Sequence, residues 1–296
     1  MPELPEVETV CRGLAALLPG RRISGVECLN AKSFPQADSA GLIGVGFTAV
    51  RRRAKLIIIE LDNGHCLLVH LKMTGQLVFV ADDGERFGAG HPNDSLVNRL
   101  PDRSTRVIFR LTGATLYFND QRKFGWILLL DTDRLAEQPF LRKLGPEPLS
   151  DTFSAEVLAQ ALRPRSRTSI KAALLDQTVL AGVGNIYADE ALWAAEVHPA
   201  RPVGSLSADD IARLWRELRV ILQLSIDQGG SSDRNYVDAT GQRGSYLRFA
   251  RVFRRQGQLC PRCGSTIIKT RVAGRGTHLC PTCQLAPVGT TDAAAR

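Results

Sequence analysis

Residues 47–71 read FTAVRRRAKLIIIELDNGHCLLVHL, and this stretch holds three short β-type runs in close succession. The runs cover residues 47–52, 56–61 and 66–71, and each contains the Val, Ile, Leu or Phe residues that strands favour. Asp62-Asn63-Gly64 separates the last two runs and is typical of a tight hairpin turn. The stretch therefore predicts antiparallel strands that follow one another along the chain.

Similar runs continue on both sides of this stretch. They lie at residues 23–28, 77–80, 107–111, 115–118 and 126–130. Eight short strands between residues 23 and 130 favour a β-sandwich. Residues 82–104 are polar and rich in Gly and Pro, so we expect a surface loop between strands there.

Helical patterns flank the β-rich region. From Pro5 to Leu18 apolar residues recur at helical spacing, and Pro19-Gly20 ends the run. After Pro146-Glu147-Pro148 the expected helices span residues 153–162, 168–175, 185–194 and 208–228, with Asp151 and Ser207 as N-caps. The Gly-rich turn at residues 180–185 opens on the third of these helices, and it suits either a bound phosphate or close packing. The expected fold class is α+β, with an N-terminal two-layer antiparallel β-sandwich.

Four of the seven cysteines form two matched pairs, and three are scattered. Cys11, Cys28 and Cys66 stand among apolar neighbours and are interpreted as buried thiols. The pairs are Cys260-x2-Cys263 and Cys280-x2-Cys283, whose thiolates together complete a tetrahedral shell around one Zn²⁺. Redox dithiols or disulfides are the alternative, but the chain shows no secretory signal. Four thiolates leave no open coordination position, so the predicted zinc is structural.

The net charge of +8 comes almost entirely from one stretch. Residues 231–283 hold ten Lys or Arg against two acids, whereas residues 1–230 carry equal numbers of each sign. Tyr and Phe are interleaved with these charges, so the stretch favours a nucleic-acid partner over a solvated basic tail. No apolar run approaches the roughly 18 residues of a membrane span, and the start MPELPEVETV is acidic, which argues against membrane and secreted classes.

Distinctive motifs are spread over the whole chain. They are Pro2-Glu3-Leu4-Pro5-Glu6-Val7-Glu8, Arg53-Ala54-Lys55, His70-Leu71-Lys72-Met73-Thr74-Gly75, Asp120-Gln121-Arg122-Lys123-Phe124-Gly125, Leu144-Gly145-Pro146-Glu147-Pro148-Leu149, Asp176-Gln177 with Gly182-Val183-Gly184-Asn185-Ile186-Tyr187, and Gly274-Arg275-Gly276-Thr277. Together these motifs resemble those of the bacterial formamidopyrimidine-DNA glycosylases. The resemblance implies a bifunctional glycosylase and AP lyase that removes formamidopyrimidines and 8-oxoguanine from damaged double-stranded DNA in base-excision repair.

The resemblance also implies an organisation. We expect a catalytic β-sandwich domain at residues 1–145, a helix-two-turn-helix domain with a lesion-recognition loop at 146–258, a zinc-finger β-hairpin at 259–285 and a tail at 286–296. It further implies one structural Zn²⁺, no nucleotide cofactor, no membrane partner, a monomer, and a place in the bacterial cytoplasm near the nucleoid.

By this resemblance, Pro2 and Glu3 carry the chemistry. Once Met1 is removed, Pro2 presents a secondary amine whose near-neutral pKa lets it attack C1′ of the damaged nucleotide and form a Schiff base, followed by β,δ-elimination. Glu3 beside it is the expected general acid and base. Without the resemblance, Pro2 would only start a helix and the acids would serve its dipole.

Further residues are implied as DNA contacts. Lys55 matches a catalytic lysine near the damaged nucleotide, and His70 and Lys171 match backbone contacts, although a lone histidine in an apolar run is more often a core residue. Asn185 and Arg275 match a phosphate clamp, with Arg275 counted among the catalytic residues. Tyr236 in the loop 229–244 matches another phosphate contact.

Three residues match those that fill the hole left by an extruded base. Met73 and Phe124 would wedge into the stack, and Arg122 would donate to the orphaned cytosine. Ordinary core packing is the alternative for the two apolar residues. Lys72 and Lys123 depart from the family pattern, as do the long 82–104 loop and residues 254–256.

Two other functions stay open at this point. An endonuclease VIII-like glycosylase for oxidised pyrimidines would use the same Pro2 chemistry, but Leu4-Pro5 and the length of the lesion-recognition loop at 229–244 argue against it. A non-catalytic zinc-ribbon DNA-binding protein would account for the cysteines and basic charge, but has no need of the Pro2-Glu3 start.

Overall fold

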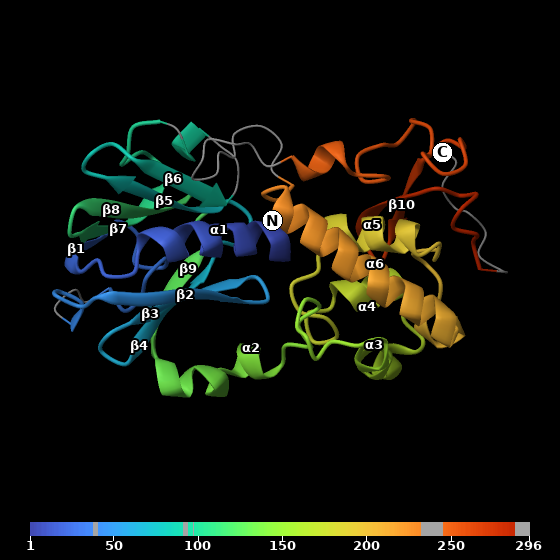
Figure 1. Ribbon diagram of the computed structural model, residues 1–296, viewed down its shortest axis with the longest axis horizontal. Helices are drawn as coiled ribbons and strands as arrows, with labels where there is room; N and C mark the ends of the chain where they lie inside the picture. The colour runs from blue at the N-terminus through green and yellow to red at the C-terminus, as the bar shows by residue number, and fades with distance from the viewer. Residues whose placement is uncertain (38–40, 91–93, 97, 232–244, 288–296) are drawn as a thin grey trace. The chain divides into compact units, whose positions relative to one another are not determined.

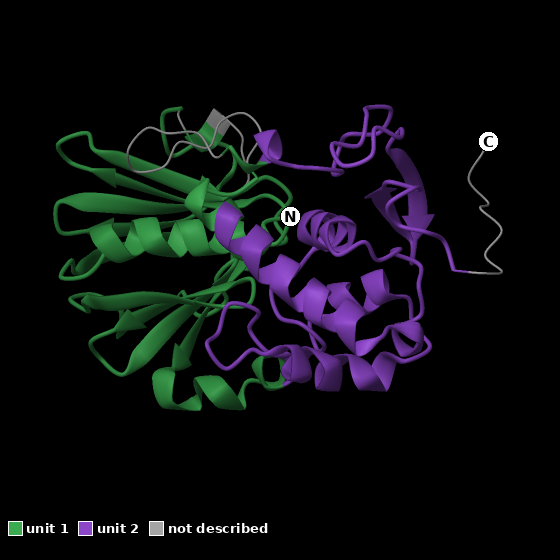
Figure 2. Ribbon diagram, turned by 45° about the vertical axis from the view of Figure 1, so that its right-hand side comes forward, with its two compact units in different colours: residues 1–142, 225–246 green, residues 143–224, 247–296 purple. Residues whose placement is uncertain are grey.

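The computed structural model describes residues 1–37, 41–90, 94–96, 98–231 and 245–287. By backbone packing the chain divides into two compact units, coloured green and purple in Figure 2. The first contains residues 1–142 and 225–246, and the second contains residues 143–224 and 247–296. The sequence-based boundaries at 145, 258 and 285 stay predictions.

The first unit is the expected antiparallel β-sandwich. Its strands are β1 (Ile23–Cys28), β2 (Phe47–Arg53), β3 (Leu56–Leu61), β4 (His65–His70), β5 (Gly75–Ala81), β6 (Arg86–Gly90), β7 (Thr105–Leu111), β8 (Ala114–Asp120) and β9 (Trp126–Asp131). One sheet has the order β1-β7-β8-β5-β6, and the other has the order β2-β3-β4-β9 (Figure 1). Every pairing between neighbouring strands is antiparallel, so the predicted α+β class with an antiparallel sandwich is confirmed.

Strand β6 corrects one expectation, because it lies inside the 82–104 segment that we interpreted as loop. Its residues pair with β5 from Val80↔Arg86 to Gln76↔Gly90. Two of its five residues are glycines, so the strand lacks the alternating hydrophobic side chains that would identify it in the sequence. Gly90 is needed there, since it adopts φ +127° and a Cβ at this position would lie 2.4 Å from the Gly75 carbonyl oxygen.

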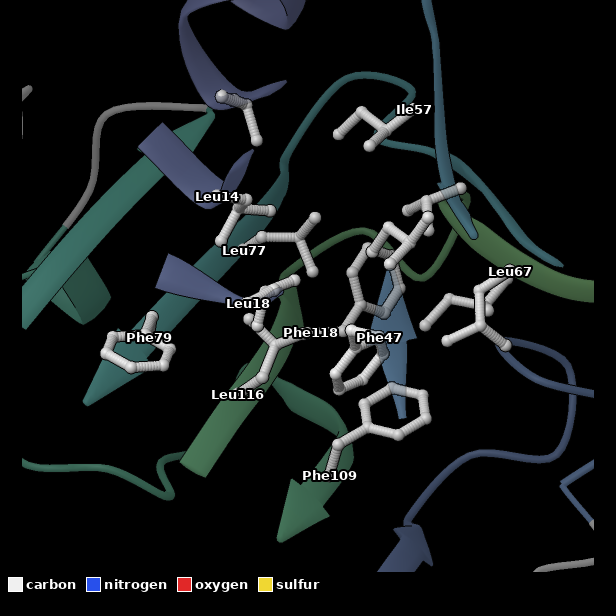
Figure 3. Close-up of a cluster of buried hydrophobic side chains, with 14 of the residues drawn as sticks. Leu14, Leu18, Phe47, Ile57, Leu67, Leu77, Phe79, Phe109, Leu116 and Phe118 are labelled. Atoms are coloured by element: carbon white, nitrogen blue, oxygen red, sulfur yellow. The ribbon is translucent and has the colours of Figure 1, made fainter. Parts of the chain in front are cut away.

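The main core lies between the two sheets and is closed by helix α1 (Leu4–Leu17). Side chains from α1 and from both sheets point toward one another, among them Leu14, Phe47 and Phe118 (Figure 3). The helix packs along β2 and β6, which are edge strands of the two sheets. Gly13 permits this approach, because a Cβ there would lie 2.1 Å from the Phe87 ring.

The remaining elements are mostly helical. They are the helices α2 (Pro139–Arg142), α3 (Ala155–Leu162), α4 (Ile170–Leu175), α5 (Asn185–Ala194) and α6 (Ala208–Asp227), the hairpin strands β10 (Ile268–Val272) and β11 (Arg275–Leu279), and 3₁₀ turns at Asp94–Leu96, Thr132–Glu137, Arg163–Arg165, Val203–Ser205 and Tyr246–Arg248. Ser207 bonds to the Asp210 N–H as a cap should, whereas α3 is capped by Ser154 and not by Asp151. Within the described part of the chain, no helix has the length and apolar character needed to cross a membrane.

Candidate active site and metal centre

The N-terminus of α1 is built as a reciprocal capping box. The Glu6 carboxylate accepts the Glu3 backbone N–H at 2.8 Å, while the Glu3 side chain accepts the Glu6 N–H. Pro5 occupies the first turn, where a missing N–H costs nothing. Pro2 and Glu3 are both buried, so the start of the chain is held in place.

Glu6 also fixes the segment that follows α6. Its second carboxylate oxygen accepts the Ser231 N–H at 2.8 Å. Gly230 adopts φ +88°, and a Cβ there would lie 3.2 Å from Glu6 Oε1. The Gly229-Gly230 pair was visible in the sequence, but nothing in the sequence indicated its contact with the first helix.

Three connections that are distant in sequence meet at one end of the sandwich. Leu56 at the start of β3 pairs with His70 at the end of β4, which pairs with Trp126 at the start of β9. The β2–β3 turn, the β4–β5 connection and the β8–β9 connection therefore lie at this end. Arg52 at the end of β2 forms an ion pair with Glu8 of α1 at 2.9 Å, which brings the N-terminal part of α1 to the same end.

Lys55 and His70 lie in this group. Lys55 follows Ala54 in the β2–β3 turn and is 6% exposed. Burial, together with the charges of Lys72 and Lys55, lowers the pKa of His70 to about 3. His70 Nδ1 accepts the Lys72 backbone N–H at 3.0 Å, so the ring is neutral and its proton is on Nε2. The ring also packs edge-on against Trp126.

Met73, Arg122 and Phe124 form one exposed cluster at this end. Arg122 Nη1 contacts Met73 Sδ at 3.1 Å, and the Arg122 guanidinium lies 4.9 Å from the centre of the Phe124 ring. Met73 is 41% exposed and Phe124 is 54% exposed. Neither apolar side chain is a core residue, so the packing alternative for them is excluded.

In the second unit, the structure places the side chain of Lys171 in the interior. Its side chain on α4 is 0% exposed, so it cannot touch a DNA phosphate in this arrangement. The ammonium instead forms an ion pair with Asp189 Oδ1 of α5 at 2.6 Å and donates to the Gly276 carbonyl at 3.0 Å and to Thr277 Oγ1 at 2.7 Å. Lys171 therefore holds helices α4 and α5 to strand β11.

Asn185 is bonded to β11, the strand that also carries Arg275. Asn185 Nδ2 donates to the Gly276 carbonyl at 3.1 Å, and Gly276 follows the exposed Arg275 directly. Thr277 Oγ1 donates to the Arg275 carbonyl at 3.0 Å. Asp189, which sequence reasoning missed, also accepts the His278 N–H at 2.9 Å. Tyr236 lies outside the described residues.

The four paired cysteines converge on one point. Their sulfur atoms all lie within 4.8 Å of one another, with Cys263 Sγ 3.4 Å from Cys280 Sγ and Cys260 Sγ 3.8 Å from Cys283 Sγ. Tetrahedral Zn–S bonds of about 2.3 Å place sulfurs roughly 3.8 Å apart, so the residues fit a zinc ion. The three scattered cysteines differ, with Cys11 and Cys66 buried and Cys28 half-buried.

The surroundings of the cluster favour thiolates at two positions. Hydrogen bonds from Ser265 lower the pKa of the Cys263 thiol to about 6. Burial raises the pKa of the Cys260 thiol, but hydrogen bonds from the Cys263 and Arg262 backbone N–H groups help to outweigh it, so this pKa is lowered. Trp193 packs in the same buried cluster as Cys260, and its indole N–H has no hydrogen-bond partner among the described residues.

Arg262 ties the first cysteine turn to helix α5. Its guanidinium lies 4.3 Å from the centre of the Trp193 ring and donates to the carbonyls of Trp193 and Ala194. The cysteines are predictable from their spacing but these partners are not, because a Trp on a helix and an Arg in a turn have no distinctive spacing.

Family comparisons cover most of the chain. Residues 1–127 match the formamidopyrimidine-DNA glycosylase N-terminal domain, residues 144–236 match the formamidopyrimidine-DNA glycosylase H2TH domain, and residues 257–286 match a zinc finger found in FPG and IleRS. Curated relatives named formamidopyrimidine-DNA glycosylase include that of Pelotomaculum thermopropionicum, 44% identical with 96% of this chain and 99% of the relative covered. That of Desulfitobacterium hafniense is 39% identical, with 96% and 100% covered.

Solved structures give the same result. A complex of the LlFpg protein with a THF-DNA and an inhibitor superposes with a TM-score of 0.84 at 33% identity, covering 96% of this chain and 100% of that one. MutM in complex with carbocyclic 8-oxo-G containing DNA superposes with a TM-score of 0.83 at 34% identity and the same coverage.

Proposed function

Because the chain belongs to the formamidopyrimidine-DNA glycosylase family, we propose that it excises oxidised purines from duplex DNA and then cleaves the strand at the resulting abasic site. The observation that carries this proposal is the group at one end of the sandwich. There the buried Pro2-Glu3 start lies at the same end as Lys55, His70 and the exposed Met73–Arg122–Phe124 cluster.

Pro2 is the proposed nucleophile. After removal of Met1, its secondary amine attacks C1′, and the glycosidic electron pair leaves with the base, which takes up a proton. Glu3 delivers a proton to O4′ as the sugar ring opens, leaving an iminium between Pro2 and C1′. The iminium acidifies the C2′ proton, so its loss expels the 3′ phosphate, and a second elimination expels the 5′ phosphate. Hydrolysis of the remaining iminium restores Pro2.

The other residues position the DNA. Lys55 and the neutral His70, which offers its Nε2 proton, bind the backbone near the damaged nucleotide. On the second unit, Asn185 and Arg275 bind phosphates. Tyr236, which lies outside the described residues, is proposed as another such contact from its family match. Met73 and Phe124 fill the stack after base extrusion, while Arg122 donates to the acceptors of the orphaned cytosine.

One Zn²⁺ held by Cys260, Cys263, Cys280 and Cys283 would have a structural role. When bound, it supplies a rigid crosslink between two turns and takes no part in the reaction. This crosslink bears on function because β11, which carries Arg275, starts five residues before Cys280. We expect the protein to act as a monomer in the bacterial cytoplasm, without a nucleotide cofactor.

A second substrate class has one observation in its favour. A Lactococcus lactis FPG (MutM) structure with a TM-score of 0.83 to this chain contains an oxidized pyrimidine in its DNA. Another, with a TM-score of 0.84, contains Fapy-dG. We therefore propose purine lesions as the main substrates and oxidised pyrimidines as the second candidate.

Base-release assays test this order. Purified protein is incubated with duplexes containing Fapy-dG opposite C, 8-oxoguanine opposite C, or thymine glycol opposite A, and released bases are quantified. We expect the highest kcat/KM on the two purine lesions. A preference for thymine glycol would reverse the order, and binding to all three without base release would indicate a DNA-binding protein without catalysis.

A further inference from the structure

The side chains of the Met73–Arg122–Phe124 cluster come from two different connections. Met73 lies between β4 and β5, and Arg122 and Phe124 lie between β8 and β9. Each connection passes through a lysine in the left-handed region, Lys72 at φ +50° and Lys123 at φ +58°. Residues with a Cβ avoid this conformation, so both connections need contacts that hold them.

Asp120 supplies those contacts from beneath the cluster. Its side chain, at the end of β8, is 0% exposed. Oδ1 accepts the Thr74 hydroxyl and also the Arg122 backbone N–H at 3.2 Å. Oδ2 accepts the Gly125 backbone N–H at 2.6 Å. One carboxylate therefore bonds to both connections, including the residue after Met73 and the backbone of Arg122.

Thr74 completes the link. Its hydroxyl donates to Asp120 and accepts the Arg122 N–H at 3.0 Å. Gly125 must be glycine for this geometry, because a Cβ there would lie 2.8 Å from Phe118 Cζ and 3.1 Å from Asp120 Oδ2. Among the described residues, the three groups that bond to the Asp120 carboxylate are all donors, a set that a carboxylate can accept in full. An asparagine in its place would turn an NH₂ group toward at least one of them.

We infer that Asp120, acting with Thr74, is a positioning residue that sets the spacing of Met73, Arg122 and Phe124 before DNA is bound. The inference rests on the proposed function, because it assigns these three side chains to the gap left by an extruded base. A wedge enters a base stack efficiently only if its parts are already in place, since ordering them on the DNA would use part of the binding energy. The network therefore acts on base extrusion and not on the chemistry at Pro2.

The test compares variants of the full-length protein at two substrates. Thr74→Val removes the relay hydroxyl with little change in shape, Asp120→Asn removes one acceptor, and Thr74→Ser restores the hydroxyl. Thr112→Val is the matched control, because the Thr112 hydroxyl accepts the Arg22 N–H in the β7–β8 turn, away from the site. Single-turnover rates are measured on an 8-oxoguanine duplex and on a preformed abasic duplex, with 2-aminopurine beside the lesion reporting unstacking.

We expect Thr74→Val and Asp120→Asn to slow unstacking and 8-oxoguanine release by about 10- to 100-fold, the effect of losing a hydrogen bond to a charged group. Abasic cleavage should change less than about twofold, because no base has to be extruded there. Thr74→Ser and Thr112→Val should match the wild type.

Two outcomes would overturn the inference. Equal slowing on both duplexes would show general damage to the unit, and unchanged unstacking in Thr74→Val would show that the network does not position the cluster. Failure of the proposed function looks different, since the wild type itself would then release no base. If Asp120→Asn does not fold, Thr74→Val and its serine rescue still decide the question.

Discussion

At the scale of single residues, His70 shows how burial decides a side chain's chemistry. Its pKa is lowered to about 3 by burial and by two neighbouring lysine charges, so it stays neutral wherever the protein is folded and active. A neutral ring with its proton on Nε2 donates to a phosphate without adding a charge. The proposed hydrogen bond from His70 to a phosphate is therefore not lost as pH rises through the usual histidine range.

This predicts a pH dependence of stability. The folded His70 does not take up a proton above about pH 3, whereas the unfolded ring does below about pH 6.5, so stability is lost as pH falls through that window. Urea unfolding of wild type and His70→Asn at pH 7.5, 5.5 and 4.5 measures it. The wild type should lose up to about 1.4 kcal/mol per pH unit more than the variant. Parallel curves of unfolding free energy against pH for the two proteins would contradict the lowered pKa of His70. His65→Asn, at the other end of β4, serves as the control.

Residues with a distinctive local pattern could be predicted from the sequence, and residues that act through space could not. The cysteine spacing predicted a cluster that the structure confirms. Asp120 and Asp189 are buried carboxylates whose partners lie up to 46 and 89 residues away, respectively. The ion pair of Lys171 with Asp189 could not be predicted for the same reason, since nothing local in the sequence indicates it.

At the scale of elements, the region where α4, α5 and β11 pack together contains basic residues with two different expected roles, one structural and one in DNA binding. Lys171 is buried and paired, whereas Arg275 is exposed at the start of β11. Each lysine or arginine that contacts a phosphate adds about one to the slope of log K against log salt.

We therefore expect different results from neutralising these two charges. Arg275→Ala should reduce the salt slope of duplex binding by about one and leave stability almost unchanged. Lys171→Met should leave the slope unchanged but cost about 3–5 kcal/mol of stability, because it strands the Asp189 carboxylate in the interior. Fluorescence-anisotropy titrations at several salt concentrations, with urea unfolding alongside, measure both. A reduced slope for Lys171→Met would restore it as a phosphate contact.

The cysteine hairpin gives a metal prediction. A chelator strong enough to compete with four thiolates should release about one zinc per chain and abolish duplex binding, with recovery on adding zinc. Trp193→Phe replaces the ring that packs in the buried cluster with Cys260 and against the Arg262 guanidinium by a smaller one, so zinc affinity should fall about 10- to 100-fold. The thiolate-to-cobalt absorption bands of the Co²⁺-substituted variant should shift as well. Identical affinity and spectra would exclude a role for the indole.

Elements with a clear period were predicted well, and those that depend on packing were not. The eight expected strands are present because their apolar residues face a two-sheet core. Strand β6 escaped prediction because two glycines replace the side chains that would mark it. The cap of α3 was misplaced by three residues, since Asp151 and Ser154 are equally good candidates until the helix start is known.

At the scale of the whole molecule, charge and chemistry lie in different parts of the sequence. The excess of Lys and Arg belongs to residues 231–283, whereas Pro2 and Glu3 lie at the start of a chain whose first 230 residues are balanced in charge. Most described residues of the basic stretch, including Arg275, belong to the second unit, and the Pro2-Glu3 start belongs to the first. This predicts that damage chemistry and general DNA affinity can be separated by mutation.

The covalent step at Pro2 is the central claim, and borohydride trapping tests it most directly. The protein is incubated with borohydride and an 8-oxoguanine duplex, and the crosslinked product is digested and sequenced by mass spectrometry. We predict a covalent protein–DNA band whose DNA adduct lies on the N-terminal peptide at Pro2, and its absence when Met1 is retained or Pro2→Gly is used while duplex binding persists. An adduct on any lysine, or a band of equal strength in the Pro2→Gly variant, would contradict the account.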